Sequence, residues 1–137
     1  MQLALTYLVT FVIFLGVDAL WLGTMAEKIY RPLIGPILLD NFRVGPALFF
    51  YLFYAVGLVI FAVSPALKAQ SWSTALIWGS LFGLFAYGTY DLTNYATLKD
   101  WGMKITVIDM IWGTFASGVG AMLAYFAASW LIATIWK

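Results

Sequence analysis

Four long runs of apolar residues, separated by short polar segments, dominate the pattern along the chain. They cover residues 3–23, 44–63, 74–94 and 105–136. A bilayer core about 30 Å thick needs roughly 20 apolar residues in a helix, and each run is long enough. In lipid every backbone amide must be bonded within its own segment, so the runs predict helices rather than strands. The pattern predicts an all-α membrane protein, a bundle of four transmembrane helices that takes in residues 1–137 as one domain.

The connection over residues 24–43 is long for a tight helical hairpin. It mixes charged and apolar residues and is interrupted by Pro32, Gly35 and Pro36. Such a segment is typical of short amphipathic helices in the headgroup layer. We therefore expect an interfacial amphipathic segment between helices 1 and 2. Trp101, close to the start of the fourth run, is expected to lie at the same interface, as tryptophans near span ends do.

Composition narrows the function classes further. Hydrophobic residues make up 64% of the chain and charged residues only 9%, whereas a soluble domain carries about 25% charged residues. This excludes a soluble enzyme and a nucleic-acid reader, and makes the lipid bilayer the expected partner. The sequence contains no Cys and no His, so it lacks the thiolate nucleophile and the usual neutral-pH general base.

Four helices would place both termini on one face of the membrane, called side A here, and the 24–43 and 95–104 connections on the other, called side B. The basic residues expected at side B are Lys28, Arg31, Arg43, Lys99 and Lys104, against Lys68 and Lys137 at side A. Basic residues in short loops mark the cytoplasmic side. We therefore expect side B to be cytoplasmic and both termini to be periplasmic.

Small residues recur at helical spacing in the last two runs. Gly79 and Gly83 form a stripe in the third run. The fourth run has one stripe of Gly113, Ser117 and Ala121 and a second of Ala116, Gly120 and Ala124. Small residues let helix backbones approach closely in membranes. We expect the third and fourth helices to pack together, and the second stripe to leave a surface for another copy, which predicts a homo-oligomer or a larger membrane assembly.

Acidic residues inside the apolar runs carry the candidate chemistry. Asp18 lies near the end of the first run, Asp91 near the end of the third and Asp109 near the start of the fourth. All three would lie at a similar depth in the side B half of the membrane. Acids in spans are costly and commonly bind protons, cations or basic side chains. The alternative is that each carboxylate simply reaches the headgroup water. The expected basic or headgroup partners are Lys28, Arg31, Lys99 and Lys104.

Local motifs place further polar side chains beside these acids. Asp18 precedes Trp21 by three residues, and Asp109 precedes Trp112 by three, so each indole shares a helix face with its acid. We expect each indole to flank the carboxylate of its own motif. Asp91 similarly shares a face with neighbouring polar residues of the third run. The predicted polar pocket therefore comprises Asp18, Asp91, Asn94, Asp109, Tyr87, Trp21 and Trp112.

These motifs also resemble a known family. The strings Asp18-x-x-Trp21-Leu-Gly23, Tyr30-Arg31-Pro32, Tyr90-Asp91-Leu92-Thr93-Asn94-x-Ala96 and Asp109-x-x-Trp112-Gly113 are similar to those of small bacterial inner-membrane proteins classed as domain of unknown function 2177. The resemblance covers nearly the whole chain. It implies a bacterial membrane protein of four helices and supplies no activity and no catalytic residues.

Three hypotheses for function follow. The first is a small transporter or ligand-binding membrane protein with a carboxylate pocket open to the cytoplasm. The second is a membrane enzyme or binder that acts on lipid headgroups, with a divalent cation held by Asp18, Asp91 and Asp109 as its one possible cofactor. The third is a structural accessory subunit in which the polar cluster only joins helices. No catalytic residue is predicted, and the sequence favours an enzyme least.

Overall fold

The computed structural model describes residues 1–136, and every regular element within them is helical. The long helices are α1 (Gln2–Met25), α3 (Val44–Leu58), α5 (Trp72–Thr97) and α6 (Met103–Ile135). The short ones are α2 (Arg31–Ile34) and α4 (Ser64–Ala69), and α4 continues α3 through a π-helical turn over Val59–Val63. The predicted all-α bundle of four long helices is confirmed. Lys137, one of the two basic residues assigned to side A, lies outside the described residues.

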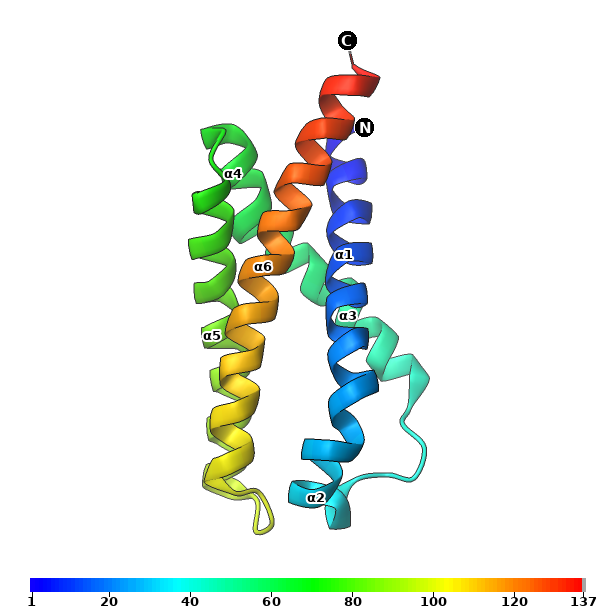
Figure 1. Ribbon diagram of the computed structural model, residues 1–137, viewed down its shortest axis with the longest axis vertical. Helices are drawn as coiled ribbons and strands as arrows, with labels where there is room; N and C mark the ends of the chain where they lie inside the picture. The colour runs from blue at the N-terminus through cyan, green and yellow to red at the C-terminus, as the bar shows by residue number, and fades with distance from the viewer. Residues whose placement is uncertain (137) are drawn as a thin grey trace.

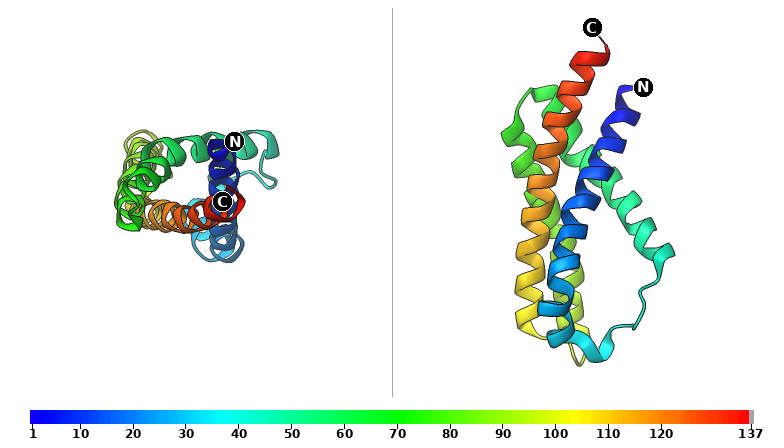
Figure 2. Two further views of the ribbon diagram at one scale, coloured as in Figure 1. Left: turned by 90° about the horizontal axis from the view of Figure 1, so that it is seen from above. Right: turned by 45° about the vertical axis from the view of Figure 1, so that its right-hand side comes forward.

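The helices stand around a common axis, with both termini at one end (Figures 1 and 2). α1 and α6 lie beside each other, and α5 lies beside α6 along its length (Figure 1). α3 begins well away from the other helices and crosses toward the side A end as it rises (Figure 2). The side B half of the bundle is therefore wider between α3 and α5 than the side A half.

Within residues 1–136, three continuous helical stretches are long and apolar enough to cross a membrane, namely Gln2–Ile37, Val44–Ala69 and Met103–Ile135. α5 is long enough at 26 residues but is less apolar than these three. Its polar residues cluster toward the side B end, where Thr89, Asp91 and Asn94 follow one another. α5 is therefore the least apolar of the four predicted spans.

The first part of the connection between α1 and α3 consists of short helical turns. α1 continues through a π-helical turn over Ala26–Tyr30 into α2 and a 3-10 turn over Gly35–Ile37. Ile34 is buried against Trp101 and Ile105, which closes the side B end of the bundle. Trp101 is only 6% exposed, so at this end of the bundle its ring packs against the protein.

Both π-helical turns end two residues before a proline. Tyr30 ends the first, ahead of Pro32, and Val63 ends the second, ahead of Pro65. Proline has no backbone N–H and its ring crowds the preceding turn, and a widened turn is a common way to accommodate such a break. The first of these turns sets the direction in which Tyr30 leaves the helix.

Glycines hold α5 against α6, as the small-residue pattern predicts. A Cβ atom on Gly79 would lie 2.7 Å from both the Ala121 side chain and the Ser117 carbonyl oxygen. A Cβ atom on Gly83 would overlap the Gly113 carbonyl oxygen and lie 2.6 Å from the Ser117 side chain. The two backbones therefore approach as closely as glycine allows.

The second small stripe of α6 faces α1 instead of a second copy. Ala116 and Ala124 are fully buried within the chain, and a Cβ atom on Gly120 would lie 3.5 Å from the Phe14 ring. The stripe that suggested an oligomer is thus used inside the protomer. It leaves no free surface on which to base an oligomer.

The tight helix contact generates a stability prediction. Gly83→Ala should lower the free energy of unfolding by about 1–3 kcal/mol, because the added methyl group must push two backbones apart. Gly16→Ala is the matched control, since nothing lies within 4 Å of a Cβ atom there. Thermal unfolding in detergent measures both. Equal melting temperatures for the two variants would contradict the close approach of α5 and α6.

Candidate functional site

The inward face of α1 leads to the site. Its buried residues are Thr6, Thr10, Phe14 and Asp18, four apart and therefore on one side of the helix. The threonine hydroxyls donate to carbonyl oxygens of their own helix, at 2.9 Å for Thr6 and 2.7 Å for Thr10. Asp18 has no such local partner, so its carboxylate must be bonded by other helices.

Two helices supply those bonds. The Tyr51 hydroxyl of α3 donates to Oδ2 of Asp18 at 2.5 Å, and the Trp112 indole of α6 donates to Oδ1 at 2.9 Å. Asp18 is only 5% exposed. Hydrogen bonds to a charged group are stronger than neutral ones, so this carboxylate joins α1, α3 and α6 at one point.

Asp109 is bonded in a similar way. It is 7% exposed, and its Oδ1 accepts from the Tyr30 hydroxyl at 2.5 Å. The Trp21 indole in turn donates to the Tyr30 oxygen at 3.0 Å. The π-helical turn after α1 therefore brings Tyr30 between the indole of one helix and the acid of another.

The two Asp-x-x-Trp motifs meet crosswise. The rings of Trp21 and Trp112 stack with centroids 4.2 Å apart and planes 7° from parallel. Trp112 donates to Asp18 rather than to Asp109 of its own motif, and Trp21 reaches Asp109 through Tyr30. Each indole thus bonds toward the acid of the other motif, because the antiparallel helices bring the two motifs together.

Asp91 of α5 has the fewest hydrogen bonds of the three buried acids. It is fully buried, and neither carboxylate oxygen has a hydrogen-bond partner among residues 1–136. Asp109 is its acidic neighbour. A buried carboxylate without a partner is costly, so this position calls for a bound proton or a cation nearby.

The two other predicted pocket residues, Tyr87 and Asn94, line two different cavities. Tyr87 lines the same cavity as Asp18 and Asp109, and its ring lies so close to Gly113 that any side chain there would overlap it. Asn94 lines a smaller adjoining cavity, with Lys99 and Trp101, and Trp101 also lines the cavity of Asp18.

Among residues 1–136, no basic side chain pairs with the three buried acids. Within residues 1–136 the one ion pair joins Arg31 to Glu27, at 2.6 Å on the protein surface. In the same range, no three acidic side chains approach closely enough to share a metal ion. Phenol and indole groups, and not Lys28, Arg31, Lys99 or Lys104, bond Asp18 and Asp109.

A cavity of about 570 Å³ opens beside the acids, between α3 and α5. Asp18, Asp109 and Trp112 form part of its wall, together with Tyr51 and Tyr87. Nine of the sixteen lining residues are aromatic, two are acidic and none is basic. The site is thus an aromatic cavity with negative charge on one wall.

Sequence reasoning missed the phenols of α3 and of the turn after α1. Tyr51 and Tyr54 are spaced three apart in an otherwise apolar run, and this spacing was an available signal for a polar face. Tyr54 bonds to the Ser117 hydroxyl at 2.7 Å inside the bundle. Tyr30 gave no comparable signal, because its direction depends on the widened turn.

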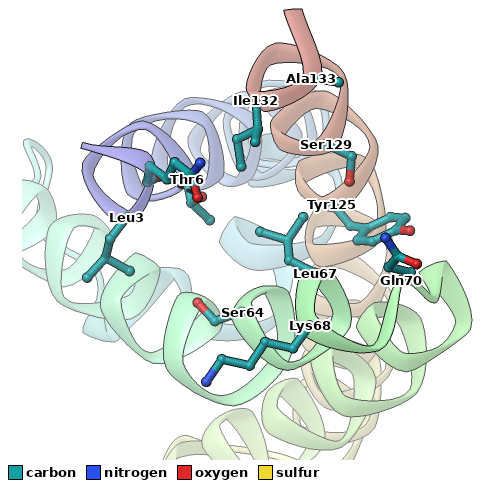
Figure 3. Close-up of a pocket in the computed structure, with 11 residues that line it drawn as sticks. Leu3, Thr6, Ser64, Leu67, Lys68, Gln70, Tyr125, Ser129, Ile132 and Ala133 are labelled. Carbon is teal, nitrogen blue, oxygen red and sulfur yellow. Dashed lines mark hydrogen bonds between the residues drawn. The ribbon is translucent and has the colours of Figure 1, made fainter. Parts of the chain in front are cut away.

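A second cavity of about 570 Å³ opens at the side A end (Figure 3). Thr6 of α1, Leu67 of α4 and Ile132 of α6 stand around its centre (Figure 3). Its wall also carries the polar groups of Gln70, Tyr125 and Ser129. The bundle therefore has a cavity toward each end.

The fold and site define an α-helical membrane protein with buried, hydrogen-bonded aspartates beside an aromatic cavity. Residues 3–126 match the family described as predicted membrane protein (DUF2177). The chain belongs to this family. It matches no curated protein and no solved structure.

The stacked indoles generate a spectroscopic prediction. Two parallel indoles at 4.2 Å should couple and produce a paired positive and negative band in the circular dichroism spectrum. Trp21→Phe and Trp112→Phe should each abolish that band pair. Trp130→Phe is the control, because this indole is 67% exposed and far from the stack along α6. A band pair that survives both substitutions would contradict the crosswise arrangement.

Proposed function

We propose that this protein is a small transporter or ligand-binding protein of the bacterial inner membrane, and that it holds a cation in the cavity between α3 and α5. The charge of the cavity wall carries this proposal. Asp18 and Asp109 contribute negative charge, and the lining contains no basic residue. Acids in a membrane interior commonly bind protons or cations, so a positively charged ligand is the natural occupant.

The orientation is part of the proposal. Basic residues gather in the connections at side B, including Lys28, Arg43 and Lys104. The positive-inside rule then makes side B cytoplasmic and side A periplasmic. The acidic cavity would accordingly belong to the cytoplasmic half of the membrane.

A path between the two cavities would follow the inward face of α1. Thr6 lines the side A cavity and Asp18 lines the acidic one, about 18 Å apart along the helix at 1.5 Å per residue. Phe14 lies between them and stacks with Tyr54, with ring centroids 4.7 Å apart. Two cavities with a closed section between them suit a carrier that opens to one side at a time better than an open channel.

A structural accessory subunit is the second candidate. The bonds that Asp18 makes to Tyr51 and Trp112 connect three helices, and they would serve a scaffold equally well. The effect of removing an acid on the stability of the protein distinguishes a scaffold from a carrier. A scaffold requires the acids for folding, whereas a carrier requires their charge for binding.

Removal of one charge tests the proposal. Asp18→Asn and Asp109→Asn should each reduce cation binding at least tenfold, because the amide keeps an acceptor oxygen but carries no charge. Asp40→Asn is the matched control, since Asp40 is exposed in the connection before α3. Binding of rubidium, manganese(II) and tetramethylammonium to the full chain measures this effect, and uptake of the same ions into liposomes containing the full chain measures transport.

Two results would count against a carrier. The first is uptake no greater than in empty liposomes for all three cations. The second is a large fall in the melting temperature of both acid variants in detergent without any cation-dependent difference. That second result would favour the accessory subunit.

A further inference from the structure

The lining of the acidic cavity identifies the kind of cation that fits. Nine of its sixteen residues are aromatic. Aromatic faces attract organic cations such as quaternary ammonium ions, and this attraction increases when water is excluded. An inorganic cation gains little from such a wall, because it prefers several oxygen ligands.

We propose that the ligand is a lipophilic organic cation, an ammonium or phosphonium ion carrying aromatic or alkyl groups, and that it enters from the lipid between α3 and α5. This inference rests on the proposed function and names its substrate class. The positive centre would lie toward Asp18 and Asp109, and the apolar groups would fill the aromatic part of the cavity.

The carboxylates of Asp18 and Asp109 are already held in fixed positions where a positive centre would bind. Phenol and indole donors hold the two carboxylates in place, at 2.5 Å from Tyr51 to Asp18 and 2.5 Å from Tyr30 to Asp109. These neutral donors fix the carboxylates without cancelling their charge. A diffuse organic cation can approach them without displacing a bond, whereas a metal ion would have to take over their oxygen atoms.

The opposite side of the cavity opens through apolar side chains. Leu38, Phe50 and Phe53 line it and are 40%, 39% and 69% exposed. The first turns of α3, which carry two of them, stand away from the other helices (Figure 2). In a bilayer these exposed apolar groups face lipid. A lipophilic cation could pass between α3 and α5 without crossing a polar barrier.

The volume of the cavity and the charge of its lining both favour a lipophilic organic cation as the ligand. The cavity of about 570 Å³ falls within the roughly 300–1,000 Å³ typical of sites for drug-sized ligands. An anionic lipid headgroup would meet two carboxylates and no basic side chain in the lining. A polyamine would leave most of its charges against aromatic and aliphatic walls.

Binding of tetraphenylphosphonium to the full chain in lipid nanodiscs tests the inference, with binding to empty nanodiscs subtracted. Triphenylphosphine oxide serves as a neutral compound of related shape. We expect saturable binding of the cation and none of the neutral compound. Asp18→Asn and Asp109→Asn should weaken binding of the cation at least tenfold, and Asp40→Asn should leave it unchanged.

A second variant keeps the test independent of the acids. Ala47→Trp adds bulk on the α3 wall of the cavity and should weaken tetraphenylphosphonium binding at least tenfold. It should weaken binding of the much smaller tetramethylammonium ion far less, and its melting temperature in detergent shows whether the variant is folded. Ala19→Trp, on the exposed side of α1, is the matched control and should affect neither ion.

The outcomes separate this inference from the proposed function. Acid-dependent binding of tetramethylammonium, rubidium or manganese(II) without binding of tetraphenylphosphonium would overturn the inference and leave the proposed function standing. Equal binding of tetraphenylphosphonium and the neutral compound would show hydrophobic partition only and overturn the inference. Failure of every cation to bind would overturn both.

Discussion

The cost of placing a carboxylate in a membrane interior governs this structure. An ionised acid away from water must be bonded by donors that the protein itself supplies. For Asp18 those donors come from Tyr51 and Trp112, which lie on two other helices. The bond geometry therefore fixes how α1, α3 and α6 rotate against one another. Close packing of glycine and alanine then holds α5 and the side A half of the bundle.

The crosswise pairing of the Asp-x-x-Trp motifs turns two separate sequence features into one unit. Trp21 and Trp112 stack, and each indole serves the acid of the opposite helix, directly or through Tyr30. The unit forms a fixed wall on the α1 and α6 side of the cavity. The opposite wall, on the first turns of α3, has no comparable set of side-chain bonds to α5 within the described residues. The α3 side of the cavity is instead bonded to α1 through Tyr51 and to α6 through Tyr54.

Much of the fold follows from the sequence, because a bilayer permits few alternatives to long apolar helices. The packing of α5 on α6 was also predictable, since Gly79 and Gly83 leave space that only another backbone fills. The inward direction of Asp18 followed from the cost of exposing an acid to lipid. Its partners did not follow, because the bond from Tyr51 depends on the rotation of α3. The direction of Tyr30 depends on a widened turn before a proline, which apolar periodicity does not reveal.

The long separations of the bonds to the acids have a consequence for biogenesis. Asp18 and Trp112 are 94 residues apart, and Tyr30 and Asp109 are 79 residues apart. During synthesis α1 leaves the ribosome first and α6 last. Asp18 can gain its bond from Tyr51 once α3 has been made, but it lacks its bond from Trp112 until the final helix arrives. A nascent chain that stops before α6 retains that defect, which gives membrane quality control a feature by which to recognise unfinished copies.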